Sequence, residues 1–266
     1  MSASALPLAI TGVASGIGAA TAQLLSSQGY ALIGIDRTTP EDFPGEFVQA
    51  DLSTKQGVSE AAAKVIALAP QGLRGLANIA GVPGTAPARV VLSVNVFAVR
   101  ELTRALAEHF TAGATVVNLA SSVAFNWRVN AAAYASFAMA ADQEAALDLV
   151  LADTDIAENS YLFSKHCVRA MTEQLCAELL PQQVRVNSVS PGPVETPILA
   201  DFKKDHGTDK VNSAAELLGR FASPQDIASA IAYLLSPQSE WVNGTDIRVD
   251  GGLVAYRGST ALSTSN

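Results

Sequence analysis

Thr11-Gly12-Val13-Ala14-Ser15-Gly16-Ile17-Gly18 is a glycine-rich turn between two segments that differ in apolar spacing. Before it, residues 6–11 form a short continuous apolar run, as in a buried strand. After it, apolar side chains recur at helical spacing from Ile17 to Leu25, and residues 30–35 form a second apolar run. A strand, a turn, a helix and a strand within about 30 residues predict the βαβ unit of a parallel sheet.

The same turn predicts a site for a dinucleotide. Glycines allow the backbone to approach a pyrophosphate closely, and the N-terminus of the following helix offers free N–H groups to it. A tight turn without a ligand is the alternative explanation for the glycines alone. The candidate contacts from this turn are Gly12, Ser15, Gly16, Ile17 and Gly18.

Asp36 adds a second feature of a dinucleotide site. It ends the second apolar run, 18 residues beyond Gly18. A carboxylate at this position can accept hydrogen bonds from both ribose hydroxyls of an adenosine. It would repel a 2′-phosphate, so NAD(H) is expected in preference to NADP(H). The neighbouring Arg37 argues in the other direction, because a guanidinium can hold a phosphate.

The rest of the chain repeats this alternation of strands and helices. Further strands are predicted at residues 47–52, 75–80, 115–120, 183–190 and 244–250. Ligands of open α/β sheets bind beyond the carboxyl ends of the strands. Asp51 and Leu52 end one such strand. The Asp51 carboxylate can meet an adenine amino group, cap the following helix, predicted at residues 54–68, or do both. We therefore expect one α/β domain over residues 1–266, a doubly wound parallel sheet of about seven strands with helices on both faces.

Composition excludes several classes of protein. The net charge of −8 among 266 residues argues against nucleic-acid binding, which needs a basic face. No apolar run reaches the roughly 18 residues of a membrane span, and the N-terminus lacks the features of a signal peptide. Cys167 and Cys176 lie too far apart along one predicted helix for a disulfide, and no cluster of His and Cys suggests a metal site. These features favour a cytoplasmic protein.

Tyr161 and Lys165 form a candidate catalytic pair. Residues four apart on a helix lie on one face, and an ammonium nearby lowers the pKa of a phenol. Such a tyrosine can move a proton to or from a substrate hydroxyl near neutral pH. The spacing alone is also common on solvated helix faces. Asn95 lies inside a helix predicted at residues 89–110, where an amide is unfavourable, so it is either functional or an exposed surface residue.

These motifs, in this order, resemble the short-chain dehydrogenase/reductase family in its short, NAD-preferring form. The resemblance covers about Leu6 to Gly252, and the layout is similar to the bacterial 3α-hydroxysteroid dehydrogenase/carbonyl reductase branch. It implies a Rossmann-type fold. The residues that carry the resemblance are the glycine turn, Asp36, Asn78-Ile79-Ala80-Gly81, Asn95, Ser121, Tyr161, Lys165, and Pro191-Gly192-Pro193-Val194 with Thr196.

The resemblance also implies roles for these residues. Tyr161 would be the general acid and base, and Lys165 would lower its pKa and bind the nicotinamide ribose. Ser121, with Ser122 as the alternative, would donate a hydrogen bond to the substrate oxygen, and Asn95 would hold a water that links Lys165 to solvent. The cofactor contacts expected beyond the glycine turn are Asp36, Arg37, Asp51, Leu52, Asn78, Ala80, Gly81, Tyr161, Lys165, Pro191, Gly192, Val194 and Thr196.

An insertion precedes the tyrosine, which comes 40 positions after Ser121. Residues 126–159 are alanine-rich with acidic residues and predict one or two helices. The insertion is a lid or wall of the substrate pocket, an element that alters subunit contacts, or a surface elaboration without a role. The resemblance implies a homo-oligomer in which a similar insertion covers a helix–helix interface and favours a dimer over a tetramer.

The C-terminal part is expected to complete the substrate site. Residues 194–221 are predicted as a mobile loop that closes over substrate. A helix is predicted from Ser223, with Pro224 at its first position, and the Ser/Thr-rich tail from Arg257 is predicted to be loose. Some apolar residues are expected either to contact substrate or to belong to the core. They are Val82, Phe125, Trp127, Leu162, Leu199 and Phe202.

These features predict an NAD-dependent oxidoreductase that interconverts a hydrophobic secondary alcohol, aromatic or alicyclic, and its ketone. The alternatives are a cis-dihydrodiol or cyclic-alcohol dehydrogenase and a hydroxysteroid dehydrogenase. A non-catalytic nucleotide-binding regulator with the same fold is a rival from another class. It is disfavoured because Asn95, Ser121, Tyr161 and Lys165 are all present, whereas a regulator could lose them freely.

Overall fold

One parallel sheet organises the protein. The computed structural model describes residues 6–263, without the side chains of Phe202, Asp205, His206, Lys210 and residues 260–263. Within these residues seven strands pair in the order β3-β2-β1-β4-β5-β6-β7, all parallel. The predicted doubly wound fold is confirmed. The strands are β1 (Leu8–Thr11), β2 (Leu32–Asp36), β3 (Glu46–Gln49), β4 (Leu73–Asn78), β5 (Phe110–Leu119), β6 (Arg185–Pro191) and β7 (Asp246–Val249).

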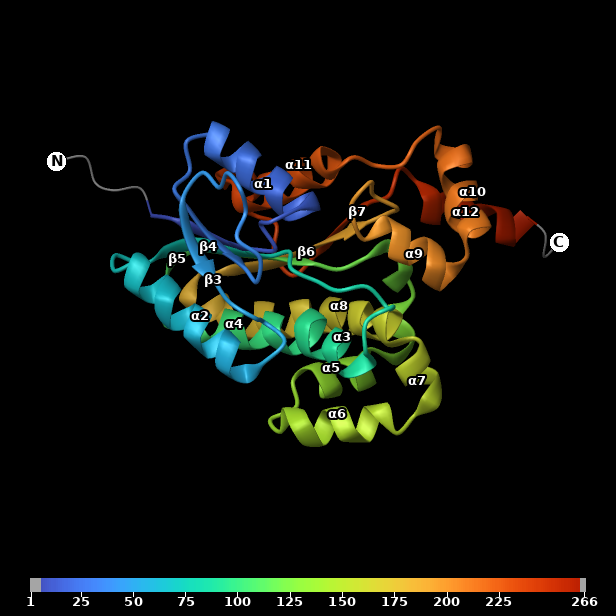
Figure 1. The fold of residues 1–266 in the computed structure, drawn as a ribbon, viewed down its shortest axis with the longest axis horizontal. Helices are drawn as coiled ribbons and strands as arrows, with labels where there is room; N and C mark the ends of the chain where they lie inside the picture. The colour runs from blue at the N-terminus through green and yellow to red at the C-terminus, as the bar shows by residue number, and fades with distance from the viewer. Residues whose placement is uncertain (1–5, 264–266) are drawn as a thin grey trace.

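Helices cover both faces of the sheet (Figure 1). On one face lie α1 (Gly16–Ser27) and α11 (Pro224–Leu235), which share a core with Leu8 and Ile10 of β1. On the other face lie α2 (Lys55–Leu68), α3 (Ala88–Leu92), α4 (Val99–Ala105) and α8 (Ser160–Leu179). Ala9 points to this second core, as the period-2 alternation of a strand requires. The strand order reverses between β1 and β4, where ligands of such sheets bind.

The insertion forms a separate helical layer outside α8 (Figure 1). The prediction of one or two helices is wrong, because Asp142 and Asp153 cap new helices and divide the acidic stretch. The buried Arg100 of α4 anchors the insertion by donating to the carbonyls of Ala138 and Ala140, both at 2.7 Å. Its elements are the 3₁₀ turn Trp127–Asn130 and the helices α5 (Ala131–Ala138), α6 (Gln143–Leu151) and α7 (Thr154–Glu158).

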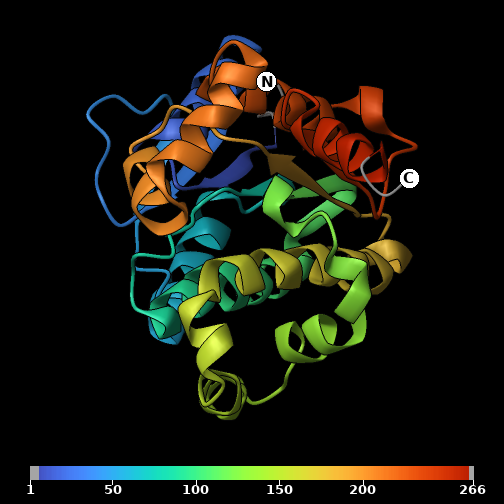
Figure 2. The same ribbon diagram turned by 90° about the vertical axis from the view of Figure 1, so that its right-hand side faces the viewer.

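Three further helices gather at one end of the molecule. Residues 194–221 do not form an irregular loop, because α9 (Leu199–His206) and α10 (Thr208–Leu218) occupy most of them; that this segment closes over substrate stays a prediction. The tail predicted to be loose from Arg257 belongs to α12 (Leu253–Ser263) as far as the described residues reach. Figure 2 faces this end and shows the orange helices α9 and α10 and the red α12 above the gold α8. No described helix combines the length and the apolar character that spanning a bilayer requires.

Candidate active site

The glycine turn is shaped by close backbone contacts. A Cβ on Gly18 would lie 1.9 Å from the carbonyl oxygen of Gly12, and one on Gly12 would lie 2.8 Å from the amide nitrogen of Ala80. Gly12 also has a φ of +79°, which side chains other than glycine rarely adopt. Thr11 Oγ1 accepts from the amides of Ile79 and Ala80, both at 2.9 Å, which ties the ends of β1 and β4 together. The turn therefore has no room for side chains at these positions.

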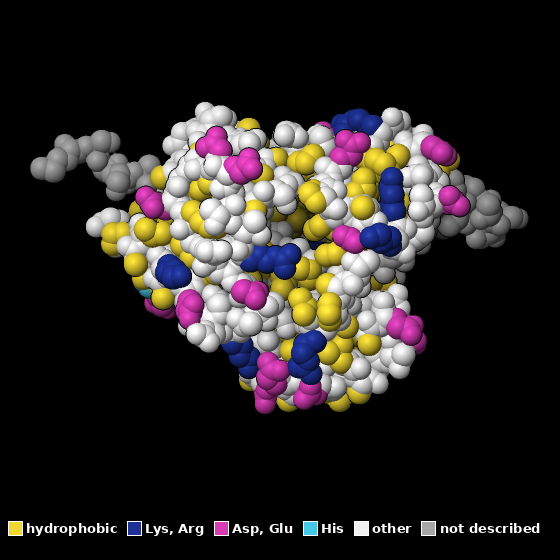
Figure 3. Space-filling model, viewed as in Figure 1, with side chains coloured by type: hydrophobic (Ala, Val, Ile, Leu, Met, Phe, Trp, Pro, Cys, Tyr) yellow, Lys and Arg dark blue, Asp and Glu magenta, His cyan; other side chains and the backbone are white. Residues whose placement is uncertain are grey.

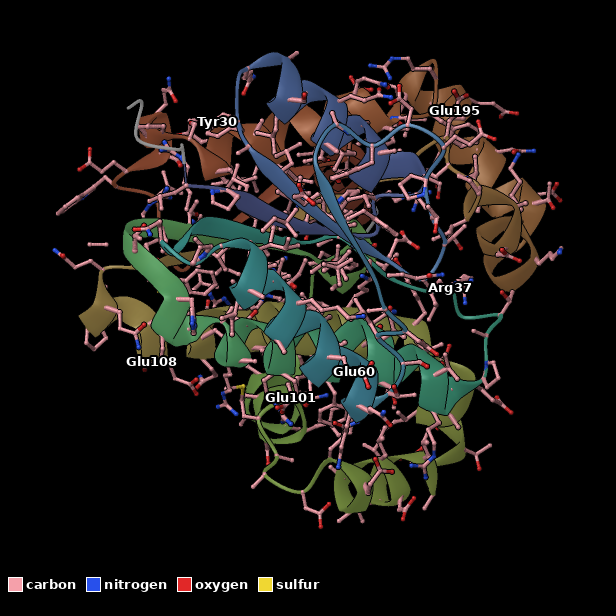
Figure 4. The ribbon with its side chains drawn as sticks, turned by 60° about the vertical axis from the view of Figure 1, so that its left-hand side comes forward. Tyr30, Arg37, Glu60, Glu101, Glu108 and Glu195 are labelled. Carbon is pink, nitrogen blue, oxygen red and sulfur yellow. The ribbon has the colours of Figure 1, made fainter. Side chains whose placement is uncertain are left out.

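Asp36 lies beside this turn at the end of β2. Its carboxylate accepts from the amides of Ala14 and Thr38, each at 3.0 Å. Arg37, labelled in Figure 4, follows directly in the next loop. One acidic and one basic side chain therefore lie where the adenosine end of a dinucleotide is expected, and their contacts with a cofactor stay a prediction.

Asp51 and Leu52 lie beyond the end of β3, which stops at Gln49. Thr54, and not Asp51, caps α2, because its side chain accepts from the Gly57 amide at 3.0 Å. Asp51 accepts from the Ser53 amide at 2.9 Å, and this hydrogen bond lowers the pKa of its carboxyl group. The Asp51 side chain is therefore held in the loop, and Leu52 is buried in the core.

Tyr161 and Lys165 meet one turn apart on α8. The Lys165 ammonium nitrogen lies 5.5 Å from the centre of the Tyr161 ring and donates to the Leu119 carbonyl at 2.8 Å. Lys165 is buried, and burial lowers its pKa from 10.5 to about 8. Tyr161 is partly exposed and lines the cavity described below. A cation is therefore fixed beside a phenol that substrate can reach.

Asn95 lies in a π-helical turn, residues Ser93–Ala98, between α3 and α4. It is buried, so the alternative of an exposed surface residue is wrong. Its Oδ1 accepts from the Val82 amide at 2.9 Å, and its Nδ2 donates to the Val82 carbonyl and to Ser164 Oγ, both at 3.1 Å. Asn95 therefore joins the loop after β4 to the helix that carries Tyr161 and Lys165. Single π turns inside α-helices are frequent at functional sites.

Ser121 and Ser122 follow β5, and both line the cavity. Both are mostly buried, and Ser121 Oγ accepts from the Val123 amide at 3.4 Å. A hydroxyl that accepts in this way keeps its own proton for donation. The position of both serines agrees with a substrate-binding role, and Ser121 remains the first candidate.

Asn78 is placed differently from the expected cofactor contacts around it. Its Nδ2 donates to Asn118 Oδ1 at 2.9 Å and to Thr103 Oγ1 at 3.1 Å, inside the core. It joins β4 to β5 and α4 and does not line the cavity, whereas Gly81 does. Asn78 is the last residue of β4 and shares the face of Leu76, which packs in the core with α4, whereas Ala80 and Gly81 belong to the loop that follows the strand.

The segment after β6 faces the glycine turn. A Cβ on Gly16 would lie 3.2 Å from Cγ2 of Thr196, so these two loops approach closely. Pro191, Gly192, Val194 and Thr196 line the same cavity as Ile17 and Gly81. The first turn of α1 holds no acidic residue, and the Ser15 side chain makes no cap hydrogen bond. This wall of the cavity therefore fits an elongated anionic dinucleotide, with its pyrophosphate at the start of α1.

A cavity of about 660 Å³ runs from these loops to the C-terminal helices. Figure 3 shows hydrophobic side chains around a hollow in the face of the molecule that it displays. The predicted pocket residues Val82, Phe125, Leu162 and Leu199 line the cavity, and the side chain of Phe202 lies outside the described residues. Other residues of the wall carry no sequence signal that points to a pocket. The missed lining residues are Val123, Ile198, Val211, Ala214, Leu253, Val254 and Arg257.

Trp127 does not line this cavity, so of the two alternatives given for it the structure agrees with the core and not with substrate contact. It is buried in the insertion, with the Arg128 and Arg169 guanidinium carbons 4.5 and 5.6 Å from its ring. Cations stacked on its faces hold the indole in place and give it a packing role.

The class of the protein follows from its parallel sheet and glycine turn, together with a buried lysine beside a tyrosine and the adjacent serines. The chain belongs to the short-chain dehydrogenase/reductase family. Residues 8–143 match the family described as short chain dehydrogenase, and residues 152–254 match the one described as enoyl-(acyl carrier protein) reductase. The segment between the two matches, residues 144–151, lies in α6 of the insertion.

The relatives are dehydrogenases and reductases. The coniferyl-alcohol dehydrogenase of Pseudomonas sp. strain HR199 is 34% identical over 93% of this chain and 96% of its own. The 3-alpha-hydroxysteroid dehydrogenase/carbonyl reductase of Comamonas testosteroni is 33% identical, and the match covers 93% of this chain and 96% of that protein. The structure of the 3-alpha-hydroxysteroid dehydrogenase from Pseudomonas sp. B-0831, solved in complex with NADH, is 36% identical in sequence and superposes with a TM-score of 0.82. The match covers 94% of this chain and 97% of that one. The family resemblance and the prediction of an oxidoreductase acting on alcohols or carbonyls are confirmed.

Proposed function

We propose that this enzyme uses NAD to interconvert a hydrophobic secondary alcohol, aromatic or alicyclic, and its ketone. The observation that carries this proposal is the Tyr161–Lys165 pair on the wall of a cavity lined mainly by apolar side chains. A mainly apolar wall favours an aromatic or alicyclic substrate over a sugar, because buried hydroxyl groups need hydrogen-bonding partners. A non-catalytic regulator would need neither the buried lysine nor the serines at the cavity.

Each residue of the site has its own role in the proposed reaction. The bound nicotinamide would accept a hydride in oxidation and return one in reduction. Tyr161 takes the hydroxyl proton in oxidation and gives it back in reduction, and the Lys165 ammonium favours the phenolate that does so. Ser121 donates a hydrogen bond to the substrate oxygen and orients it. Asn95 fixes the position of α8 through Ser164. A water held at Asn95 would connect Lys165 to solvent.

Asp36 supports NAD as the cofactor. Its carboxylate stands at the end of β2, where it would bind the ribose hydroxyls and repel a 2′-phosphate. The NADH in the 3-alpha-hydroxysteroid dehydrogenase from Pseudomonas sp. B-0831 supports the same choice. Arg37 remains the feature that would help NADP(H), and comparing the two cofactors tests the preference directly.

A hydroxysteroid or another cyclic alcohol is the second candidate substrate. The Comamonas testosteroni relative is named for a 3-alpha-hydroxysteroid, and a shorter match, 34% identical over 36% of this chain, is a cyclopentanol dehydrogenase. Coniferyl alcohol, for which the relative from Pseudomonas sp. strain HR199 is named, is a primary alcohol with an aromatic ring, and it is included in the test below.

The decisive experiment is a panel of alcohols and ketones with NAD and NADH, followed by the absorbance of NADH. The panel contains 1-phenylethanol, cyclopentanol, a 3α-hydroxysteroid, coniferyl alcohol and a sugar. We expect turnover of the first three, with cyclic and aromatic secondary alcohols preferred over the sugar. Turnover of the sugar alone, or of none of these with intact NADH binding, would contradict the proposal.

We also propose that the protein is a homodimer. The insertion packs against α3 and α8 from outside, and the Arg89 guanidinium forms ion pairs with Glu144 and Asp148 of α6. An outer helix face that is covered in this way is no longer available to another subunit. Light scattering after size-exclusion chromatography should give twice the mass of 27.5 kDa, and a tetramer would contradict the proposal. The cytoplasmic location expected from the sequence stays a prediction.

A further inference from the structure

Phe125 is an exposed aromatic side chain on the wall of the cavity. It is 61% exposed and lines the cavity together with Ser121 and Ser122. None of the aromatic pairs among the described residues includes it. An exposed phenyl ring gains free energy when a ligand covers it, because its apolar surface leaves water. The ring of Phe125 is therefore available to a molecule that enters the cavity.

The backbone that carries Phe125 is held on both sides. Before it, the buried Ala124 donates its amide hydrogen bond within a 3₁₀ turn. After it, the side-chain oxygen of Asn126 accepts from His166 Nε2 at 3.0 Å. His166 belongs to α8, the helix that also carries Tyr161. The Phe125 ring therefore stands on a backbone whose position relative to Tyr161 is fixed.

The rest of the cavity wall is mainly aliphatic. Among the described residues that line it, the aromatic ones are Phe125 and Tyr161, and the other apolar side chains are those of Leu, Ile, Val, Ala and Pro. Aliphatic side chains contact a saturated ring and an aromatic ring about equally well, because the gain depends on the apolar area that is buried. Two aromatic rings attract each other further in offset or edge-to-face geometry. Phe125 is thus the residue of this wall that can distinguish an aromatic ring from an alicyclic one.

We propose that Phe125 packs against the ring of the substrate and selects an aromatic secondary alcohol or ketone over an alicyclic one. This inference rests on the proposed function, because it assumes that the carbinol is held at Tyr161. It decides between the two kinds of ring that the proposed function leaves open, and it assigns the choice to one residue.

A matched pair of substrates tests the inference. 1-Phenylethanol and 1-cyclohexylethanol share the same secondary carbinol and differ in whether the attached ring is aromatic. The ratio of their kcat/KM values, aromatic over alicyclic, should fall about three- to tenfold in Phe125→Leu, because leucine stays apolar and loses the aromatic pair. The intrinsic reactivity of each alcohol and any general loss of activity cancel in this comparison of ratios.

Phe125→Tyr and Val129→Ala are the matched controls. Phe125→Tyr keeps an aromatic ring and should keep the ratio within about twofold of that of the natural protein. Val129 is 78% exposed and does not line the cavity, so Val129→Ala should leave the turnover of both alcohols unchanged. Equal losses for both alcohols in Phe125→Leu would overturn the inference, because they would assign Phe125 to general packing. A changed mass of this variant in light scattering would also overturn it, because it would assign Phe125 to a subunit interface.

A binding measurement separates this inference from the proposed function. Acetophenone and cyclohexyl methyl ketone are titrated into the NADH complex of Tyr161→Phe, in which proton transfer is blocked, and NADH fluorescence reports binding. Tighter binding of acetophenone that is lost when Phe125→Leu is added supports the inference even if the natural enzyme oxidises neither alcohol. Turnover of both alcohols with an unchanged ratio in Phe125→Leu supports the proposed function and overturns the inference.

Discussion

Lys165 places its ammonium nitrogen 5.5 Å from the centre of the Tyr161 ring, inside a site that excludes water from the lysine. If Tyr161 transfers the proton, Tyr161→Phe should reduce kcat by about a thousandfold, within the range of general acid–base catalysis. NADH binding, measured by fluorescence titration, should stay within about twofold, since the ring remains. Tyr233→Phe on α11, where the tyrosine is 41% exposed, is the control. Full turnover by Tyr161→Phe would assign the proton transfer to another group.

The buried lysine should make the enzyme less stable below pH 8. Burial lowers the pKa of Lys165 to about 8, so below that pH the folded protein carries a buried ammonium and bears its full cost. Between about pH 8 and 10 the unfolded chain binds a proton that the folded chain does not, so the free energy of unfolding rises with pH. Lys165→Met removes the charge and should be more stable than the natural protein at pH 7 by up to about 3 kcal/mol.

This stability difference should shrink as the pH approaches 10. Urea unfolding of both proteins at pH 7 and 10 measures it, and the comparison cancels the titration of other groups. Lys64→Met, at an exposed position on α2, should change the stability little at either pH. A difference between Lys165→Met and the natural protein that is independent of pH would show that lysine burial does not set it.

Asp36→Ala should weaken the binding of NAD more than the binding of NADP. The variant loses a partner for the ribose hydroxyls of NAD, which we expect to raise its Kd about tenfold. For NADP the same change also removes a repulsion, so the two effects offset each other. Fluorescence titration with NADH and NADPH gives both constants, and Asp42→Ala at an exposed position is the control. Equal weakening of NADH and NADPH binding would show that Asp36 does not determine the cofactor preference.

Gly18→Ala should either unfold the protein or lower its free energy of unfolding by about 3 kcal/mol or more. Its Cβ would lie 1.9 Å from the Gly12 carbonyl oxygen, and two backbone segments would have to separate. Gly29→Ala makes the same change at a φ of +85° with no atom within 4 Å, so it should cost only about 1–2 kcal/mol. Urea unfolding compares the two. Similar costs would mean that the tight packing of the turn does not matter to stability.

The sequence predicted the parts of this fold that rest on strong local patterns. Continuous apolar runs mark strands that are buried on both faces, and Pro224 after Ser223 marks the start of α11, where Ser223 and Asp226 form a capping box. The four-residue spacing of Tyr161 and Lys165 is enough to bring them to one side of α8. These features need no knowledge of distant contacts.

Features that depend on tertiary contacts were missed. In α10 the apolar residues Val211, Ala214, Ala215 and Leu218 recur at helical spacing, but the polar residues 203–210 before them made the whole segment look like a loop. Trp127 has the composition of a pocket residue, and only the guanidinium groups of Arg128 and Arg169 show where it packs. A short-range pattern cannot report partners that lie far away along the chain.

The π turn at Ser93–Ala98 makes the length of this segment as constrained as its composition. A π turn holds one residue more than an α turn, and each residue of an α-helix rotates the next by about 100°. Deleting a single residue here would let one regular helix run from α3 into α4 and would swing the Asn95 amide away from Val82 and Ser164. Alignments and engineered chimeras of this enzyme must therefore keep the register of this helix, because a one-residue gap would be more damaging than most substitutions.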